Sequence, residues 1–564
     1  MSRVSVQKKT RKNKRRLGVP VKRIRGKYYK TRGSIGTNYW LKSDFIIYPP
    51  IHIGSLKHRR VAEKLAVFIA SEGHSLHEVN KWGFVNLLRE VIDPAYLPPS
   101  SKSLTRMILN LGLKARILVG TVLRNKEVVV TADIATVTTT TMGYLVMTAH
   151  YIAESTIDSV TLAARQLNCR HTADEIYSQL CLIIEDFGLK TKQIVGAVTD
   201  GGANMVKAMR MLVGKDQHIV CINHTIHNIV KRSLKDSKEL SSTFEKLHKL
   251  VTYFKHSTLA MDKLRNSQEE CGVLPSNITY LKRAIKPRWN SEYLSAKSYL
   301  DMECYVNKAL EDDADHENLN EDEVTHLQDY IGITAVMYEL TSMYSGEKYP
   351  TVNLVIPGLK YAMYKMGNFA AKTQEGKAMK DSLIKQLQAL LNELHLSRIH
   401  IKATLLDPRY RSDHLDVSAN AKAVEIVNSL LKEERSKSDD SLDASLMDGS
   451  IFQPYLVQQI KEKIEAWSTS YDRELKHYLN CPTEDFDANP IQYWQNRIEG
   501  FSPFLSKIAL RALLIPASST ASERAVSALN LIAVKKRARL TKKNVDILVF
   551  LKCLDKKHWK IISP

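Results

Sequence analysis

The N-terminal half of the chain changes its hydrophobic period at about residue 125. Apolar residues recur every three or four positions in VAEKLAVFIASEG, FVNLLREVI and SLTRMILNLGLKARILVG, which predicts helices over 61–124. A proline cluster at 94–99 separates the second run from the third. From Lys126 the runs KEVVVTADIATV, GYLVMTAHYI and SVTLAARQL are rich in β-branched residues and predict three neighbouring antiparallel strands. A helical unit therefore precedes a sheet.

The segment after these strands alternates between the two periods. TADEIYSQLCLIIEDFGL predicts an amphipathic helix that begins near Thr172 or Asp174 and ends near Gly188. A buried strand ending at Asp200, the helix ANMVKAMRMLVG and the strand HIVCIN follow. The predicted order is three strands, a helix, a strand, a helix and a strand, which is typical of an α/β fold. We expect the first strand to pair with the strand after the first helix, as in the ribonuclease H-like fold, over residues 125–232.

The rest of the chain is predicted to be mostly helical. Residues 233–500 form a large helical insertion with two polar stretches, an acidic solvated one at 311–323 and a flexible linker at 432–450. Residues 501–564 turn apolar again and are expected to complete the core. They also carry more apolar surface than a small terminal unit can bury alone, which predicts dimerisation through Leu505, Ile508, Leu548 and Phe550.

Composition narrows the class of protein. A hydrophobic content of 44% with 25% charged residues is typical of a globular chain. An apolar run of 18 residues is missing, which argues against a membrane span, and the N-terminus has no apolar secretory region. Seven scattered cysteines without a C-x-x-C pair indicate a reducing compartment and no zinc site built on such pairs. A small-molecule substrate is not expected.

The net charge of +22 is concentrated at the N-terminus. Residues 1–43 hold 15 Lys or Arg and no acid, so 1–60 is predicted to be a basic disordered arm. Nuclear import and salt-dependent contact with DNA phosphates are two uses of such an arm. A solvated tail without specific function and an organelle-targeting segment remain alternatives. The candidate DNA-contacting residues here are Lys8, Lys9, Arg11, Lys12, Arg15 and Arg16.

Two acids are placed on predicted core strands. Asp200 ends an apolar strand in AVTDGGANM, where it forms a tight turn or binds a ligand at the strand end. Asp133 lies within VVVTADIATV, where a carboxylate is costly unless it is hydrogen-bonded, exposed on an edge strand or bound to a cation. If the two strands are adjacent, both acids point into one cleft and suit a hard cation such as Mg²⁺.

Glu523, in PASSTASERAVSALN, is the candidate for a third acid. Thr520-Ala521-Ser522-Glu523 also fits the S/T-x-x-E capping box, in which the glutamate only satisfies the first turn of a helix. Taken alone, the local sequence favours the capping box.

Six motifs in order resemble the hAT superfamily of hobo- and Activator-type transposases and the BED-finger proteins derived from them. They are TADIATV with GYLVMTAHYI, AVTDGGANM, CINHTIHNIV, PRWNSEYL, ATLLDPRYR and the C-terminal PASSTASERAVSALNLIAVKKRARLTKKNVDILVFLK. Together they span residues 61–560 roughly, and the C-terminal match to the family's dimerisation segment is the most specific. The resemblance implies a nuclear, dimeric DNA-binding protein.

The resemblance also implies roles for single residues. Asp133, Asp200 and Glu523 match the three metal-binding acids of a phosphodiester cleavage and strand-transfer site that uses Mg²⁺ or Mn²⁺. Trp289, beside Arg288, matches a residue that stacks on an unpaired DNA base, although a core tryptophan is the alternative. Cys221 and His224 match a C-x-x-H element that supports the acids. Zinc is not expected there, even with His227 as a third ligand.

Three departures from the family pattern bear on activity. A BED finger is not found upstream of the helical unit, Ala135 stands where a tryptophan is usual, and Gly201-Gly202 replaces Asn-Ala. These changes favour a transposase-derived DNA-binding protein with a regulatory role, which is the function we expect. The retained acids favour the alternative, an active metal-dependent DNA transposase or nuclease. A ribonuclease acting on RNA hybrids is a third hypothesis that rests on fold alone. Terminal inverted repeats beside the gene would favour a mobile element.

Overall fold

The computed structural model describes most of the chain. Described are residues 21–24, 27–30, 56–94, 96–137, 141–167, 171–285, 289–311, 313, 316–445, 471–498, 502–534 and 540–563. Two short strands, β1 (Val21–Ile24) and β2 (Lys27–Lys30), pair antiparallel inside the arm that we expected to be disordered. The first helix then begins at Leu56 rather than at residue 61.

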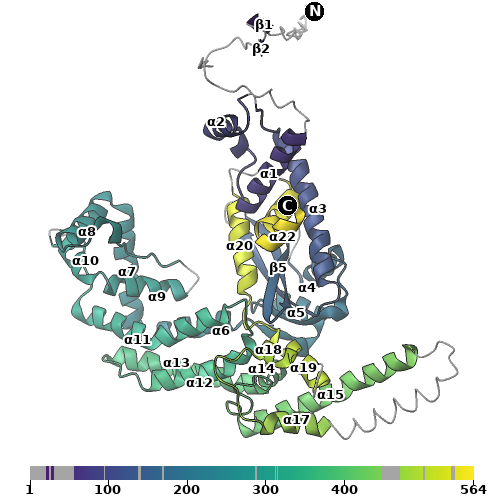
Figure 1. Cartoon of the computed structure of the whole chain (residues 1–564). Helices are drawn as coiled ribbons and strands as arrows, with labels where there is room; N and C mark the ends of the chain where they lie inside the picture. Colours follow the sequence, from purple (N-terminus) through teal and green to yellow (C-terminus); the bar gives the residue numbers. More distant parts are fainter. Residues whose placement is uncertain are drawn as a thin grey trace, which may run out of the picture.

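A five-stranded mixed sheet forms the centre of one half of the molecule (Figure 1). The strand order is β5-β4-β3-β6-β7, in which β4 runs antiparallel to β3 and β5, and β3, β6 and β7 are parallel. The predicted antiparallel meander and the predicted pairing of the first strand with the fourth are both confirmed. The strands are β3 (Val128–Val137), β4 (Met142–Ala153), β5 (Thr156–Gln166), β6 (Ile194–Thr199) and β7 (His218–Val220).

Helices from both ends of the described chain cover this sheet. Figure 1 shows α20 and α22 from the C-terminal end beside α1 and α3 from the N-terminal end. Buried side chains of these helices and of the strands form one hydrophobic core, so residues 61–124 are not a separate unit. The helices are α1 (Leu56–Glu72), α2 (Trp82–Val91), α3 (Ser101–Leu123), α4 (Ala173–Asp186), α5 (Ala203–Val213), α20 (Thr520–Ile532), α21 (Lys542–Lys552) and α22 (Lys556–Ile562).

The helical insertion has a core of its own, which continues into β7 and α19. None of its helices, nor any other helix in the described part of the chain, has the length and apolar character to cross a membrane. The helices are α6 (Ile222–Lys235), α7 (Lys238–His256), α8 (Thr258–Glu270), α9 (Trp289–Leu300), α10 (Glu303–Leu310), α11 (Glu321–Tyr344), α12 (Val355–Gly367), α13 (Gln374–Leu396), α14 (Arg398–Leu405), α15 (Val417–Ser445), α17 (Tyr471–Asn480), α18 (Pro490–Gln495) and α19 (Pro503–Leu513).

The prediction of a flexible linker at 432–450 is wrong for most of that stretch. Helix α15 continues through it to Ser445. Glu434 forms an ion pair with Arg511 of α19, and Arg511 also pairs with Glu127 beside the start of β3 at 2.5 Å. The polar composition of this stretch hides that contact, because its partner lies far along the sequence.

Asp158 on β5 joins the sheet to the insertion. Its buried carboxylate accepts hydrogen bonds from Tyr151 Oη (3.0 Å) and Lys348 Nζ (2.7 Å) and also pairs with Lys557. Burial alone would raise the pKa of Asp158, but the hydrogen bonds from the two lysines outweigh it and lower the pKa to about 2. The carboxylate therefore stays ionised at neutral pH and holds three segments together.

The apolar C-terminal residues that we expected at a dimer surface lie inside the chain. Leu505 and Ile508 are buried in the core of the insertion, and Leu548 and Phe550 are buried in the core of the sheet. Phe550 meets Phe187 edge-on, with ring centroids 5.8 Å apart. The reasoning from unburied apolar surface was wrong, because α3 and β5 cover α21.

Replacing Leu548 and Phe550 with Asp should therefore unfold the sheet domain rather than produce a folded monomer. Each change places a charge in a close-packed interior, and loss of a buried leucine or phenylalanine side chain alone costs about 3–5 kcal/mol. Circular dichroism melting with light scattering measures both folding and mass. Leu531→Asp, at an exposed leucine of α20, is the matched control and should melt as the parent does. A cooperatively folded monomer from the double variant would contradict this expectation.

Candidate active site

Asp133 and Asp200 lie on adjacent parallel strands at the same level of the sheet. Ala132 of β3 is paired with Thr199 of β6, so the residues that follow each of them are neighbours. Strand β3 is central, which excludes the edge-strand interpretation of Asp133. Asp200 Oδ1 also accepts the Gly202 N–H at 3.2 Å, which confirms that this acid forms a turn.

Glu523 reaches the same place from the C-terminal segment. Helix α20 begins at Thr520 with Ser519 as its N-cap. Glu523 is therefore in the fourth helical position, whereas a capping box requires the third. The capping-box alternative is therefore wrong.

The charges of Asp200 and Glu523 act on Asp133. The pKa of Asp133 is raised to about 6, first by burial and then by the negative charges of Asp200 and Glu523. A hydrogen bond from the backbone of Ile134 and the nearby His224 act in the opposite direction. Acids 67 and 390 residues from Asp133 therefore lie close enough to affect its pKa.

The carboxylates of Asp133, Asp200 and Glu523 are ligands that suit a hard divalent cation, but their side chains are not arranged to coordinate one. Carboxylate oxygens are the ligands that Mg²⁺ prefers, and a cation would relieve the repulsion that raises the pKa of Asp133. Within the described ranges, however, no three His, Cys, Asp or Glu side chains stand in a metal-holding arrangement. The chemistry and charge of the acids fit a metal, and their side chains must move closer together to coordinate it.

A buried polar contact fixes Glu523 against β3. Thr131 Oγ1 lies 2.8 Å from Ser522 Oγ, and both residues are buried. Thr131 precedes Asp133 by two positions and shares its face of the strand, and Ser522 is next to Glu523. His150 Nε2 lies 3.2 Å from the same Thr131 hydroxyl, and burial lowers the pKa of His150 to about 4. A neutral histidine and two hydroxyls thus hold the two acids in register.

A second buried contact lies behind Asp200. Thr199 Oγ1 is 2.8 Å from His218 Nε2, and the Thr199 hydroxyl also donates to the backbone oxygen of Asp200 at 3.0 Å. Burial, followed by the charge of Arg210, lowers the pKa of His218 to about 4. The backbone at Asp200 is therefore held by a neutral histidine from the neighbouring strand.

Cys221 connects the segment of Asp200 with that of Glu523. Its N–H donates to Thr199 O at 2.8 Å, and its Sγ accepts from the Ser519 N–H at 3.4 Å. The side chain is fully buried, and burial raises the pKa of the thiol. His224, one turn further along α6, is exposed and lies close enough to lower the pKa of Asp133. Both residues therefore lie near the acids, and their supporting role stays a prediction.

The insertion clamps the loop before Glu523. Ala517 N donates to Thr351 Oγ1 at 2.9 Å, and Ala517 O accepts from Ile222 N at 2.9 Å. Ser518 Oγ donates to Tyr344 O, the last residue of α11, also at 2.9 Å. The large insertion therefore returns to the site and holds the third acid in place.

Trp289 is a core residue, contrary to its expected role in stacking on DNA. Its side chain is 2% exposed, and its backbone N–H donates to His227 Nδ1 at 3.1 Å. Burial, with the charges of Lys231 and His224, lowers the pKa of His227 to about 4, which keeps Nδ1 an acceptor. The tryptophan thus anchors the start of α9 against α6. Arg288 and the candidate arm residues lie outside the described residues; the latter are Lys8, Lys9, Arg11, Lys12, Arg15 and Arg16.

Sequence reasoning missed the hydroxyl and imidazole groups behind the acids. Thr131, Thr199 and Ser522 each lie within two positions of an acid, and that proximity was the available signal. His150 and His218 gave no local signal, because their roles depend on which strands are neighbours.

One family model matches the C-terminal part of the chain. Residues 474–553 match the hAT family C-terminal dimerisation region. This stretch includes Glu523 and runs from α17 to α21.

Known proteins resemble most of the chain at low identity. A Zea mays protein named as an AC transposase is 23% identical over 73% of this chain and 54% of its own length. The Hobo transposase of Drosophila melanogaster is 24% identical over 55% of this chain and 47% of its own length. Zinc finger BED domain-containing protein 6 of Mus musculus is 21% identical over 89% and 56%. The chain spans about half the length of these curated relatives. Residues 474–553 thus match the hAT dimerisation region, and the chain is similar to hAT transposases over most of its length.

Proposed function

We propose that this protein binds DNA and breaks or transfers its phosphodiester bonds at the cluster of Asp133, Asp200 and Glu523, with Mg²⁺ or Mn²⁺ as cofactor. The observation that carries the proposal is the pairing of β3 with β6 beside Asp133 and Asp200, together with the 2.8 Å contact between Thr131 and Ser522 that brings Glu523 to β3. The raised pKa of Asp133 supports it. Structural ion-pair networks also perturb pKa values. In this protein, however, the causes of the Asp133 pKa shift include two acids from remote segments and no Lys or Arg.

A ribonuclease H-like core is part of this proposal. The strand order is β5-β4-β3-β6-β7. Strand β4 is antiparallel to β3, and β3, β6 and β7 are parallel to one another, which agrees with the strand pairing expected of that fold. The acids lie at the carboxyl end of β6 and beside it on β3, where ligands gather in open α/β sheets. The fold therefore supports a ligand at the acids, and the chemistry rests on the acids themselves.

The acids would bind the cation, and the buried residues behind them would keep the acids in position. When bound, a divalent cation activates an attacking hydroxyl and stabilises the leaving oxygen of a phosphodiester. Asp133, Asp200 and Glu523 supply the carboxylate oxygens that would hold it. The buried contacts of Thr131 and Thr199 limit the movement of the strands and of α20, because catalysis is sensitive to displacements of about 1 Å. Protonation of Asp133 below about pH 6 would weaken the site.

DNA as partner, a homodimer and a nuclear location belong to the same proposal. The net charge of +22 favours a polyanion, and two of the similar proteins are named as transposases. The matched dimerisation region supports a homodimer. Because Leu548 and Phe550 are buried within one chain, the contact between copies would use other, exposed faces of this region.

A regulatory DNA-binding dimer is the second candidate. It is favoured by the acids, which do not form a metal-holding set among the described residues, and by Trp289, whose ring lies in the core. Ala135 and Gly201-Gly202 point in the same direction, since they depart from the family pattern. This candidate requires DNA binding without strand cleavage.

Purified protein should nick supercoiled plasmid in the presence of Mn²⁺ if the acid cluster is catalytic. Asp200→Asn and Glu523→Gln should each lower the nicking rate at least a hundredfold, because each removes a charged ligand. The two variants remove a charge without changing side-chain size, and gel densitometry gives the rates.

Asp174→Asn and Glu185→Gln are matched controls, since both residues are exposed acids on or beside α4. They should nick as the parent does. Nicking by the parent that survives both cluster substitutions would refute the catalytic role. DNA binding without nicking by the parent would leave the regulatory candidate.

Asp133→Asn should stabilise the metal-free protein at pH 8. The folded chain binds the Asp133 proton more tightly than the unfolded chain, in which the pKa is near 3.8. Asp133 therefore favours folding below about pH 4, and that contribution is lost as the pH rises through about 6. The gain at pH 8 should be about 1–3 kcal/mol in urea unfolding and should vanish near pH 4. An equal gain in the free energy of unfolding at pH 4 and pH 8 would contradict this, because the gain would then not come from removing the charge of Asp133.

A further inference from the structure

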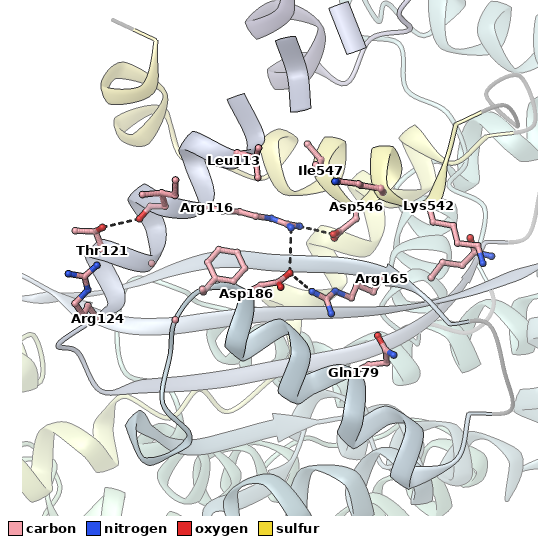
Figure 2. Close-up of a pocket in the computed structure, with 16 residues that line it drawn as sticks. Leu113, Arg116, Thr121, Arg124, Arg165, Gln179, Asp186, Lys542, Asp546 and Ile547 are labelled. Atoms are coloured by element: carbon pink, nitrogen blue, oxygen red, sulfur yellow. Dashed lines mark hydrogen bonds and ion pairs between the residues drawn. The ribbon is translucent and has the colours of Figure 1, made fainter. Parts of the chain in front are cut away.

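A groove runs along the outer edge of the sheet beside β5, apart from the acid cluster. Helices α3, α4 and α21 form its walls, and it encloses about 770 Å³ (Figure 2). Along α3 it extends from Leu113 to Arg124, which corresponds to about 16 Å at 1.5 Å per residue. The groove is therefore elongated and follows the strand.

The groove is positively charged. Its lining contains five cationic side chains and two acidic ones, a difference of 5 − 2 = +3. Arg124 lies at one end, and Arg165 and Lys542 lie towards the other, as Figure 2 shows. The charged lining residues are Arg116, Arg124, Arg165, Lys542, Lys543, Asp186 and Asp546.

The two acids hold the arginines in place. Asp546 Oδ2 accepts from Arg116 at 2.6 Å, while its Oδ1 accepts the N–H of Ala164 on β5 at 2.8 Å. Asp186 pairs with Arg165 and lies 3.6 Å from Arg116. Helix α21 thereby closes the edge of the sheet at Ala164, and Arg116 and Arg165 are fixed along the groove.

The groove is close to the acid cluster through the register of the sheet. Asp133 is paired with Val146, and Val146 is paired with Ala164. Two strand spacings separate Asp133 from Ala164, which is about 10 Å between their backbones. Arg165 is the next residue on β5, so its side chain points to the opposite face of the sheet from Asp133, and Val146 and Ala164 are buried. The groove is therefore a surface of its own, near the acid cluster but separate from it.

The remaining lining suits a nucleic acid strand rather than a compact anion. Leu113 and Ile117 on α3 are 53% and 71% exposed, which offers an apolar shoulder to sugars. Gln166, Gln179 and Thr121 add uncharged polar groups. Cations at both ends of an elongated groove match charge that is spread along a backbone.

We infer that this groove binds the sugar-phosphate backbone of the DNA on which the protein acts. The inference rests on the proposed function, because it names where that DNA is held. Contacts of this kind set position and affinity without reading sequence. Binding at the groove should therefore depend on salt and be similar for unrelated sequences.

The test uses the full chain, so that the basic arm contributes equally to every variant. Arg124→Glu with Lys543→Glu reverses two exposed charges at the groove, and Lys377→Glu with Lys385→Glu reverses two exposed charges on α13 as the matched control. Fluorescence anisotropy with an oligonucleotide gives affinity against salt. The groove variant should bind about tenfold or more weakly, and its salt slope should fall by about two. The α13 variant should stay close to the parent.

Lysine acetylation read by mass spectrometry provides a second measurement on the unmodified protein. DNA should protect Lys542 and Lys543 from acetylation and leave Lys377 and Lys385 as reactive as before. Equal melting temperatures of parent and variants show that folding is unchanged.

The outcomes separate the two claims. A parent that binds no DNA at any salt concentration refutes the proposed function, and the inference with it. A parent that binds and nicks DNA while the groove variant binds equally well, with both groove lysines unprotected, overturns the inference alone. Protection that grows with protein concentration in the absence of DNA also overturns it, because the groove is then a contact between copies.

Discussion

The buried contact between Thr131 and Ser522 makes one site out of two distant parts of the chain. Their hydroxyl oxygens are 2.8 Å apart, although the residues are 391 positions apart in sequence. Each lies beside an acid, so this contact sets how Asp133 and Glu523 face each other. An unpaired hydroxyl at this buried position would cost about 1–3 kcal/mol, which explains why the arrangement is specific. The pairing of β3 with β6 then adds Asp200 to the same place.

The helical insertion is part of this arrangement rather than an appendage. It leaves the sheet at α6 and returns at α19, and both junctions lie at the acids. Cys221 at the first junction accepts a hydrogen bond from Ser519 after the second. The end of α11 holds Ser518, and Asp158 ties β5 to Lys348 just beyond α11. A movement of the insertion would therefore be transmitted directly to Glu523.

Much of this could be predicted from sequence, because it depends on local pattern. The β-branched runs and helical periods gave the strand order, and Asp133 and Asp200 stood out as carboxylates on apolar strands. Glu523 could not be separated from a helix cap without the family resemblance, since its neighbours fit a capping box. The structure decides against the cap by starting α20 at Thr520.

The errors share one physical cause. Periodicity shows that a face is buried, but not what buries it. Leu548 and Phe550 were assigned to a second copy because α3 and β5, which cover them, lie nearly 400 residues or more away. Trp289 was assigned to DNA from the family resemblance, and its contact with His227, 62 positions earlier, could not be predicted from the local sequence. The hydroxyls and histidines behind the acids were missed for the same reason.

Mn²⁺ binding to the metal-free protein, followed by electron paramagnetic resonance, tests most directly whether the three acids form one cation site. The account predicts saturable binding that is weakened at least tenfold by each of Asp133→Asn, Asp200→Asn and Glu523→Gln, and left unchanged by Asp174→Asn. Binding that none of the three substitutions weakens would contradict the account, because the acids would then be neighbours without a shared ligand.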